Sequence, residues 1–435
     1  MAPRVSFQTL GCKVNAYDTA AMAEHLRAAG CEIVSPEAAA DVVIVNTCTV
    51  TDAADAESRR LARRVRRLNP AARLIVTGCY AQTKPDEVAD LEAVDHVIGT
   101  NRLEELVRVA LGTEEGLPRV VVEDVRRSRD VRTFGARRFD GHTRAFLKVQ
   151  EGCDLFCTFC IVPMARGRSR SLSPRQVLRE MESLAAAGFA EVVLTGVHLG
   201  GYGEDLEPPL SLACLLEALV EQGLFRRVRL SSVDPHEVTE RLVAVMAASD
   251  DVCPHLHVPL QAGDDATLRR MRRRYDTTLA AERLAMIAER VPDVSIGTDL
   301  IAGFPGEDEA AFERTLRFVE AAPLAYAHVF PYSVRSGTTA AKLPDQVSRA
   351  TIRQRARCLR EVTTRQAVAH RRRFDGTRAE ILVEATRDPA SGCLRGYTRN
   401  YLRARLDGPD RLQGRPVAAA LRVGTDGDVR AEPTE

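Results

Sequence analysis

Short apolar runs alternate with amphipathic stretches over residues 1–112, the pattern of an open parallel α/β sheet. The apolar runs predict strands at 5–10, 42–46, 74–77 and 96–98. Helices are predicted at 16–29, 51–68 and 103–111. Residues 113–139 are charged and weakly periodic, which predicts a linker with one possible strand at 119–122.

The same alternation restarts at residue 145 and continues to residue 332. Six strands are predicted, at 145–150, 191–195, 227–232, 255–261, 295–301 and 325–332. Helices between them are predicted to begin near Pro174, Leu210, His236, Asp264 and Asp308. Six βα units are fewer than the eight that close a full barrel. We therefore expect a partial, open-sided (β/α)6 barrel over residues 140–373.

A long helical stretch at 346–373 ends the barrel region and carries nine arginines against the single acid Glu361. This face fits either solvated surface or a phosphate-binding surface. Beyond it, Gly and Pro separate short alternating strands, predicted at 379–384, 393–398, 402–406, 416–423 and 428–430. Residues 374–435 are therefore predicted to form a small all-β barrel.

The composition indicates the cellular compartment but does not indicate a binding partner. The 61 basic and 60 acidic side chains nearly cancel, so net charge favours no class of ligand. No apolar run reaches the length of a membrane span, and residues 1–13 lack the regions of a signal peptide. Eleven cysteines in such a chain favour metal ligands in a reducing compartment over disulfides. We expect a cytoplasmic protein with no membrane partner.

Three cysteines stand just past the first predicted barrel strand, where barrels of this class bind ligands. Cys153, Cys157 and Cys160 are separated by three and then two residues, and the loop has no fourth Cys or His. A [4Fe–4S] cluster normally takes four thiolates, so three leave one iron open to another ligand. The alternatives are a zinc knuckle or a chance group of cysteines.

A second set of cysteines follows three predicted strands of the amino-terminal sheet. Cys12, Cys48 and Cys79 each come directly after an apolar run. The carboxyl ends of parallel strands open onto one crevice, so these thiols are expected to converge. They would form a second cluster that also lacks a fourth cysteine. The alternative is that each is a small buried apolar residue.

Taken together, these features resemble the methylthiotransferase family of radical S-adenosylmethionine (SAM) enzymes over nearly the whole chain. The amino-terminal motifs are Thr9-Leu-Gly-Cys-Lys-Val-Asn15, Asn46-Thr-Cys48 and Thr77-Gly-Cys-Tyr-Ala-Gln82. The cysteine loop Gly152–Pro163 is followed by Ala165-Arg-Gly-Arg-Ser-Arg170. Barrel motifs include His255-Leu-His-Val-Pro-Leu-Gln261, although Ala262 stands where the family usually has Ser. Gly396-Tyr-Thr-Arg-Asn-Tyr-Leu402 resembles part of a TRAM domain, the family's RNA-binding β-barrel.

The resemblance implies two [4Fe–4S] clusters with different tasks. Cys153, Cys157 and Cys160 would hold the cluster that cleaves SAM to a 5′-deoxyadenosyl radical. Cys12, Cys48 and Cys79 would hold an auxiliary cluster that carries the sulfur. The product would be a methylthio group on C2 of an adenine in a tRNA anticodon stem-loop. The reaction would also need an electron donor such as flavodoxin or ferredoxin, and a sulfur source.

The substrate branch rests on fewer residues. Gly11-Cys-Lys-Val-Asn15 resembles the MtaB type, which acts on N6-threonylcarbamoyladenosine at tRNA position 37. The isopentenyladenosine branch usually has Gln-Met-Asn after this cysteine, and the ribosomal-protein branch has Pro-Lys-Asn. Both remain alternatives. A non-catalytic iron–sulfur protein that binds RNA or senses redox state is the alternative from another class.

Candidate SAM contacts stand at the predicted strand ends: Gly196, His198, Ser232 and Gln261. Each also fits an ordinary polar turn residue. Cys253, His255 and His257 alternate onto one face of a strand, which favours barrel lining over a metal site. Arginines cluster on the helix at 51–68, in the linker at 126–138 and at 269–274. These clusters fit either solvated faces or an anticodon-stem contact.

Overall fold

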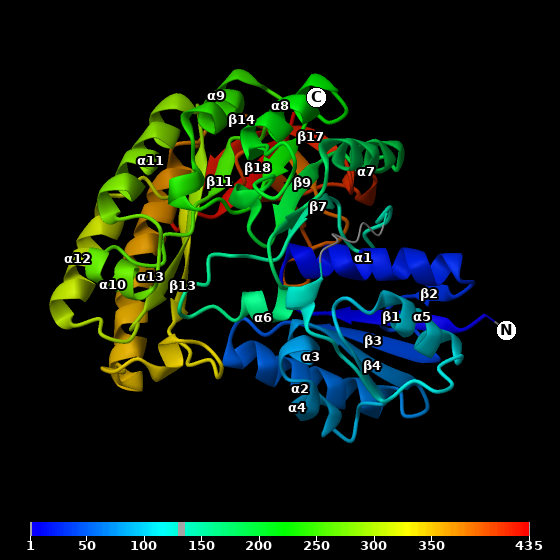
Figure 1. Ribbon diagram of the computed structural model, residues 1–435. Helices are drawn as coiled ribbons and strands as arrows, with labels where there is room; N and C mark the ends of the chain where they lie inside the picture. Colours follow the sequence, from blue (N-terminus) through cyan, green and yellow to red (C-terminus); the bar gives the residue numbers. More distant parts are fainter. Residues whose placement is uncertain (1, 129–134, 435) are drawn as a thin grey trace.

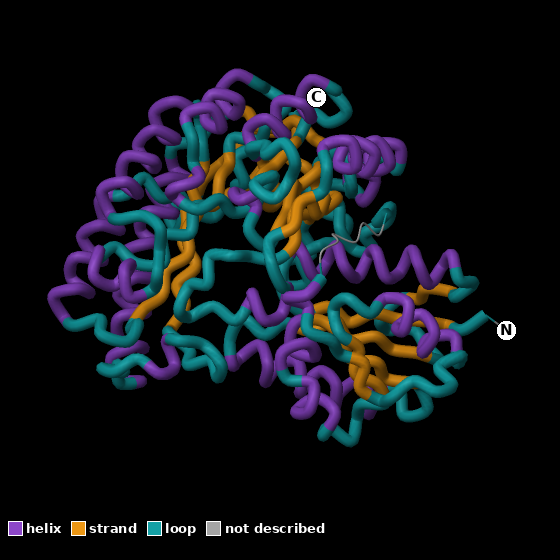
Figure 2. The backbone as a smooth tube through the Cα atoms, in the orientation of Figure 1, coloured by secondary structure: helices purple, strands orange, loops and turns teal. Residues whose placement is uncertain are grey.

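The structure is a computed structural model that describes residues 2–128 and 135–434. The amino-terminal α/β region lies beside the mouth of a larger, curved βα barrel, and a small β-barrel packs against the base of that barrel (Figure 1). Figure 2 shows helices flanking both the amino-terminal sheet and the outer wall of the barrel. The α/β fold with its carboxy-terminal β-barrel is the predicted one.

Six parallel strands form the amino-terminal sheet in the order β2-β1-β3-β4-β5-β6. The strands are β1 (Arg4–Thr9), β2 (Glu32–Val34), β3 (Val42–Thr47), β4 (Arg73–Gly78), β5 (His96–Ile98) and β6 (Val120–Val121). The helices are α1 (Lys13–Ala28), α2 (Asp52–Leu68), α3 (Cys79–Thr83), α4 (Pro85–Ala89) and α5 (Leu103–Leu111). The expected linker strand is therefore β6, an edge strand of this sheet.

The apolar residues at the centre of this sheet account for its formation. β3 is buried along its whole length, as expected of a parallel strand covered on both faces. Separate apolar clusters fill the two faces, one including Val43 and Val45, the other Val42 and Ile44. Thr51 caps α2 by accepting a hydrogen bond from the backbone of Ala54, which ends the loop after β3 at a defined place.

The predicted six-stranded partial barrel is present. Its parallel strands run in the order β7-β9-β10-β11-β12-β13, with β10 and β11 joined through a bridge between Ser232 and His257. Within the described residues β13 does not pair with β7, so this side stays open. The strands are β7 (Ala145–Glu151), β9 (Val192–Gly196), β10 (Val228–Leu230), β11 (His255–His257), β12 (Ser295–Ala302) and β13 (Tyr326–Pro331), with β8 (Arg170–Ser171) antiparallel to β7.

The barrel helices begin where the sequence offers caps. Each of α7 to α13 follows a Ser, Thr or Asp whose side chain accepts a backbone hydrogen bond. They are α7 (Pro174–Ala186), α8 (Leu212–Glu221), α9 (Glu240–Ala248), α10 (Asp265–Arg270), α11 (Thr277–Arg290), α12 (Glu309–Ala321) and α13 (Arg349–Arg372), and the short α6 (Val162–Arg166) follows the cysteine loop. No helix in the described ranges is long and apolar enough to cross a bilayer.

Two predicted barrel strands are shorter than expected, and the run 227–232 forms a strand only over β10. The run 255–261 forms a strand only over β11, because Pro259 has no N–H to donate to a ladder. The chain then turns, and Gln261 adopts a positive φ of 63° before it bridges Leu300. This turn brings Gln261 to the carboxyl end of the barrel by an irregular path.

Five strands close the carboxy-terminal barrel in the order β14-β15-β16-β18-β17. They are β14 (Arg378–Val383), β15 (Leu394–Thr398), β16 (Arg403–Leu406), β17 (Pro416–Val423) and β18 (Val429–Pro433). The β15–β16 turn docks on the base of the βα barrel, where Arg227 donates to the carbonyl of Tyr397 and Arg229 to that of Arg399. Glu191 is fully buried between the two arginines, and their charges lower its pKa to about 2 although burial opposes this.

Candidate active site

The amino-terminal thiols converge because three strands run in register. Thr9 of β1 pairs with Asn46 of β3, which pairs with Thr77 of β4. Cys12, Cys48 and Cys79 follow that row within three residues, so all three leave the sheet at one edge. All three thiols are free, and Cys12 and Cys48 both lie near enough to Cys79 to contribute to its raised pKa, of which burial is the main cause.

Asn15 fixes the spacing of these loops. Its Nδ2 donates to the carbonyls of Leu10 at 2.7 Å and Thr47 at 3.0 Å, which joins the loops after β1 and β3. Gly78 has a φ of 91°, and a Cβ there would lie 2.5 Å from the backbone of Thr47. Only glycine therefore lets the chain reach Cys79 so close to the neighbouring loop.

The second thiol set occupies a loop after β7 that the barrel holds at several points. The Cys153 N–H donates to the carbonyl of Gly167 at 3.1 Å, and the Cys160 N–H donates to Cys157. Thr158 anchors the middle of the loop by donating its N–H to Met271 and its hydroxyl to Arg270. The three thiols thus share one short, fixed loop at the strand end.

Arg273 places a positive charge against this loop. Its Nη1 donates to Cys157 Sγ at 3.2 Å, and its Nη2 pairs with Asp234 at 2.6 Å. The side chain is buried, so the pair holds the guanidinium where a thiolate would need a counter-charge. This arginine was predicted only as one member of a basic cluster for RNA, and its contacts instead belong to the cysteine site.

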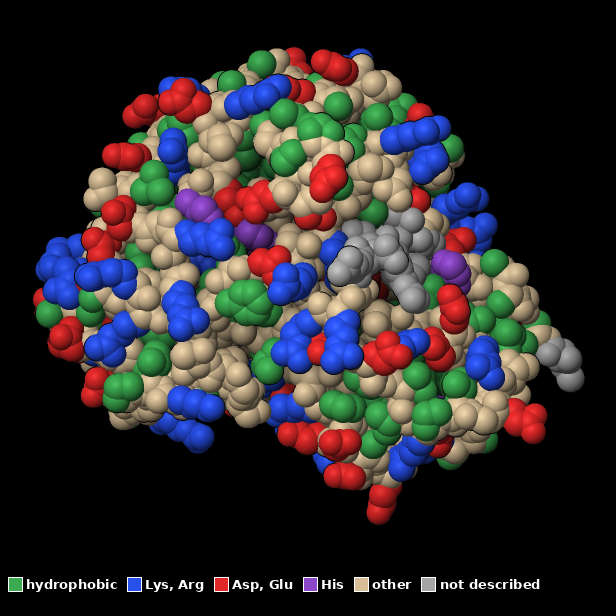
Figure 3. All heavy atoms as spheres, viewed as in Figure 1, with side chains coloured by type: hydrophobic (Ala, Val, Ile, Leu, Met, Phe, Trp, Pro, Cys, Tyr) green, Lys and Arg blue, Asp and Glu red, His purple; other side chains and the backbone are tan. Residues whose placement is uncertain are grey.

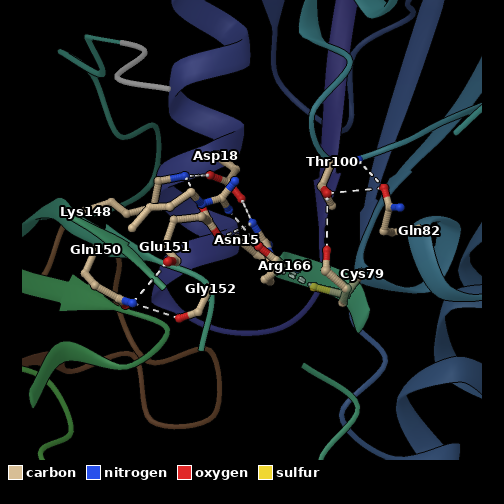
Figure 4. A network of polar contacts seen from close by, with 12 residues as sticks. Asn15, Asp18, Cys79, Gln82, Thr100, Lys148, Gln150, Glu151, Gly152 and Arg166 are labelled. Carbon is tan, nitrogen blue, oxygen red and sulfur yellow. Dashed lines mark hydrogen bonds and ion pairs between the residues drawn. The ribbon is translucent and has the colours of Figure 1, made fainter. Parts of the chain in front are cut away.

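Arg166 links the segment that follows one thiol set to a cysteine of the other, and Figure 4 shows its side chain beside Cys79 and Asn15. It ends α6, the helix that begins directly after the Cys153–Cys160 loop, and it donates Nε to Cys79 Sγ at 3.2 Å. Its Nη2 donates to Asn15 Oδ1 at 2.6 Å and its Nη1 pairs with Asp18 at 2.5 Å. Cys79 therefore lies beside the helix that follows the Cys153–Cys160 loop, although 74 residues separate Cys79 from Cys153.

A buried ion-pair network also joins the barrel to the amino-terminal region. Lys148 on β7 bonds Asp18 of α1 at 2.7 Å and Glu151 at 2.6 Å. Opposite charges outweigh the large effect of burial, so the pKa of Asp18 is lowered and that of Lys148 is raised. Barrel and amino-terminal region are thereby joined by charged groups that remain ionised around neutral pH.

The donor sets fit iron–sulfur clusters. Burial raises the pKa of Cys79, Cys153 and Cys160 to about 12, so each is a neutral thiol until a metal displaces its proton. Three thiols with a nearby guanidinium form each set, and the thiols make no disulfide. Soft thiolates select iron–sulfur clusters or zinc over hard cations.

The four candidate SAM residues lie along consecutive strand ends. Gly196 ends β9, and a Cβ there would lie 2.9 Å from Oε1 of Gln150. His198 donates its N–H to the same oxygen at 2.7 Å. Ser232 and Gln261 follow β10 and β11. The structure therefore brings Gly196 and His198 together around Gln150 and places the other two on the neighbouring strands.

The His198 side chain has a partner of its own. Its Nε2 faces Glu237, whose hydrogen bond and charge raise the pKa of His198 although burial acts in the opposite direction. Asp234 lies in the same group, and one ligand atom from each of these three residues falls within 4.8 Å of the others. His198 is thus part of a polar wall that continues through Asp234 to Arg273.

The histidines of β11 share one face of the strand, and His257 also groups with Asp299 and His328, with one ligand atom of each within 4.8 Å of the others. His255 and His257 lie on one face and both contact the hydroxyl of Tyr326, at 2.8 Å and 3.3 Å. Burial, followed by the charge of Arg229, lowers the pKa of His255 well below its usual value. These side chains line the barrel interior.

Some arginines of the predicted clusters bind other residues of the protein, and others are exposed to solvent. On α2, Arg66 pairs with Asp95 and Arg59 with the Tyr80 hydroxyl, whereas Arg63, Arg64 and Arg67 are exposed. In the linker, Arg129 and Arg132 lie outside the described residues. On the face in Figure 3, basic and acidic side chains are interspersed.

Sequence reasoning did not find several of these polar groups, namely Asp18, Lys148, Gln150, Glu151, Asp234 and Glu237. Most of them bind partners more than thirty residues away in the chain. A single sequence does not show which residues at such separations come into contact. Arg166 had a signal, since it stands in the Ala165–Arg170 motif after the cysteine loop.

Known proteins match both halves of this arrangement. The uncharacterized protein family UPF0004 matches residues 4–99, and the radical SAM superfamily matches residues 147–319. Threonylcarbamoyladenosine tRNA methylthiotransferase MtaB of Bacillus subtilis is 38% identical over 420 residues, covering 96% of this chain and 93% of the relative. The chain belongs to the radical SAM methylthiotransferase family.

Relatives of this methylthiotransferase include other branches. A tRNA-2-methylthio-N(6)-dimethylallyladenosine synthase of Frankia casuarinae is 38% identical, covering 90% of this chain and 74% of the relative. The ribosomal protein uS12 methylthiotransferase RimO of an Anaeromyxobacter species is 36% identical, covering 91% and 85%. Among solved structures, the radical SAM methyltransferase TsrM of Kitasatospora setae has a TM-score of 0.55 at 18% identity over 77% of each chain, which shows a shared fold.

Proposed function

We propose that this methylthiotransferase adds a methylthio group to C2 of N6-threonylcarbamoyladenosine at position 37 of tRNA. The observation that carries the proposal is that Arg166, which ends the helix after the Cys153–Cys160 loop, contacts Cys79 of the other thiol set. The substrate is supported by the Gly11-Cys-Lys-Val-Asn15 motif and by the relatives from Bacillus subtilis and Aquifex aeolicus, both called threonylcarbamoyladenosine tRNA methylthiotransferases.

In this proposal Cys153, Cys157 and Cys160 hold one [4Fe–4S] cluster, and Cys12, Cys48 and Cys79 hold the other. When bound, SAM and the two clusters supply the radical that activates C2 and the sulfur that C2 receives. Arg273 and Arg166 place positive charge beside one thiol of each set. Gly196, His198, Ser232 and Gln261 are the candidate SAM contacts, with Gln150 added because it orients the first two.

The chain would do its remaining work by positioning. Hydrogen abstraction from an aromatic C–H depends on alignment and exclusion of water more than on a tuned acid. The buried network of Lys148, Asp18 and Glu151 keeps the two walls at a fixed separation. The carboxy-terminal β-barrel is proposed as a TRAM-like RNA-binding domain, and the domains as residues 1–112, 140–373 and 374–435.

A tRNA substrate also implies the other partners. We propose the anticodon stem-loop as the bound RNA element, cytoplasm as the compartment, and flavodoxin or ferredoxin as the electron donor. A sulfur source must also supply the transferred atom. Exposed Arg63, Arg64 and Arg67 on α2 are available for phosphates.

Nucleoside analysis of tRNA from a deletion strain tests the function. The strain should lose the 2-methylthio group from threonylcarbamoyladenosine and keep it on isopentenyladenosine, and the wild-type gene should restore it. Replacing Cys12, Cys48 and Cys79 together with Ala should abolish restoration and lower the iron content from about eight to about four per chain.

The matched control replaces Cys214, Cys358 and Cys393 with Ala, three half-buried thiols outside both sets. It should restore the modification. Loss of the group only from isopentenyladenosine would assign the chain to the other tRNA branch. Full activity of the Cys12, Cys48 and Cys79 variant would exclude the second cluster site.

A further inference from the structure

A cavity of about 460 Å³ opens beside the amino-terminal thiols. The chain from Thr9 to Ala16 forms one wall and includes Cys12 and Lys13. The opposite wall consists of the strand-entry segment before β7, with Arg144, and of the carboxy-terminal barrel, with Tyr401. Three regions of the chain that are remote in sequence therefore enclose one space next to a proposed cluster ligand.

The charges that line this cavity do not balance. Glu384 is its one acidic side chain among the described lining residues, and it pairs with Arg395 at 2.9 Å and Arg144 at 3.6 Å. Lys13 is the third cation. Its side chain has no hydrogen-bond or ion-pair partner in the ranges 2–128 and 135–434. A half-buried ammonium without a protein partner favours an anionic ligand.

The Lys13 ammonium lies close enough to the barrel to act on groups of β11, β13 and the β15–β16 turn. After burial, which is the main cause, the charge of Lys13 contributes to the lowered pKa of His255 on β11 and of His328 on β13. It also acts on Tyr401 of the β15–β16 turn. An anion that reaches Lys13 would therefore sit between the cysteine-bearing wall and the barrel interior.

We propose that Lys13 binds the carboxylate of the threonylcarbamoyl group and so selects this nucleoside. The inference rests on the proposed function and names the residue that reads its substrate. Adenine carries C2 and N6 on the same ring. A base whose C2 faces the Cys12 end of the cavity thus presents its N6 substituent inside the same cavity. An isopentenyl group is uncharged and would leave the Lys13 ammonium unpaired, at a cost that discriminates against it.

Binding of three anticodon stem-loops to the anaerobically reconstituted holoenzyme tests this. Position 37 carries threonylcarbamoyladenosine, its methyl ester, or unmodified adenosine. The wild type should bind the acid about tenfold more tightly than the ester, the size expected for one hydrogen bond to a charged group. Lys13→Gln should bind acid and ester alike, and Lys13→Arg should keep the preference.

Lys342→Gln is the matched control, because Lys342 is an exposed lysine that does not line this cavity. It should bind every stem-loop somewhat less tightly and keep the acid-over-ester ratio. Iron content and unfolding temperature establish that Lys13→Gln is folded and loaded. If that variant does not fold, the ratios of the wild type and Lys13→Arg decide.

Two results would overturn the inference: a wild type that binds acid and ester equally, or a folded Lys13→Gln that keeps the tenfold ratio. Failure of the proposed function is a different result. In that case the wild-type holoenzyme would thiomethylate an isopentenyladenosine stem-loop and leave the threonylcarbamoyladenosine stem-loop unchanged.

Discussion

Arg166 shows how one side chain can serve two sites. Its guanidinium contacts Cys79, Asn15 and Asp18 of the amino-terminal region and Glu151 of the barrel. The side chain is 5% exposed, so these partners replace nearly all of its water. Burial lowers the pKa of Arg166, but its contact with Cys79 and the charges of Asp18 and Glu151 more than compensate, so the pKa stays well above its usual value.

Replacing Arg166 with Gln should destabilise the protein markedly. The change leaves Asp18 and Glu151 buried with a single cation, Lys148, between them. Breaking a buried pair costs about 3 kcal/mol, so the unfolding temperature of a chain of this length should fall by about 3 °C. Differential scanning calorimetry under anaerobic conditions measures this.

The control is Arg63→Gln, an exposed arginine on α2. It should shift the unfolding temperature by less than about 2 °C. An equal effect of the two substitutions would mean that the Arg166 network adds little stability.

At the scale of elements, α13 carries both a core face and a surface face. Arg355 is buried and pairs with Glu307 and Glu309, and Arg371 donates to the carbonyl of Gly427. These arginines stabilise the packing of α13 and cannot bind phosphate as well. The nine-arginine face predicted from the sequence is therefore only partly available to RNA.

His370 of α13 should make stability depend on pH. Burial, with help from Arg373 and Arg371, lowers its pKa to about 4, and its Nε2 lies 2.9 Å from Ser295 Oγ on β12. An unfolded histidine titrates near 6.5. Between these values the unfolded chain binds the extra proton, so stability is complete above pH 6.5 and falls as pH drops toward 4.

We expect His370 to account for about 3 kcal/mol of the stability lost between pH 7 and pH 4. His370→Gln should have a correspondingly flatter pH profile in denaturant unfolding. His25→Gln, at an exposed position on α1, should leave the slope unchanged. Parallel profiles for the wild type and His370→Gln would contradict the assignment.

The elements that sequence predicts well are those with a long periodic signal. The central strand β3 begins with the unbroken apolar run 42–45, and barrel strand β9 begins with the run 192–194. β2 has three residues and β8 has two, too few for a period to appear. The stretch from Asp264 divides into α10 and α11, because Asp276 provides a second cap within it.

For the whole molecule, two arginine-centred contacts add to the Lys148–Asp18 pair in joining the amino-terminal region to the barrel. Arg166 forms the first. Arg335, which follows β13, forms the second by pairing with Asp52 at 2.6 Å and Asp55 at 3.0 Å and donating to Thr49. Those partners come directly after Cys48, so this contact positions the second thiol set against the barrel.

Arg335→Gln should uncouple the two halves of the reaction. Both cysteine sets are intact in this variant, so iron content and SAM cleavage to 5′-deoxyadenosine should stay near wild type. Methylthio transfer needs the two walls in alignment and should fall about tenfold to a hundredfold. Chromatography of nucleosides and of 5′-deoxyadenosine from the same reaction measures both.

Arg317→Gln is the control for this substitution, since Arg317 is exposed on α12 and pairs only loosely with Glu313. It should change neither product. Equal losses of 5′-deoxyadenosine and of transfer in Arg335→Gln would point to a general folding defect.

The candidate site was predictable only where the chemistry lies in local spacing. Cys153, Cys157 and Cys160 are neighbours in the chain, and Cys12, Cys48 and Cys79 follow recognisable strands. Convergence of the second set follows from the geometry of parallel sheets. The guanidinium groups of Arg166 and Arg273 reach thiols 87 and 116 residues away, and only the folded chain shows which arginines do so.

The length of the short helix α6 limits where residues can be inserted into the chain. Because it begins two residues after Cys160 and ends on Arg166, its length sets the angular position of that guanidinium. One added residue would rotate Arg166 by about 100° about the helix axis and turn it away from Cys79. The interval between Cys160 and Arg166 therefore has a fixed number of residues, whereas an insertion at an exposed turn such as Gly116 leaves both metal-binding walls in place.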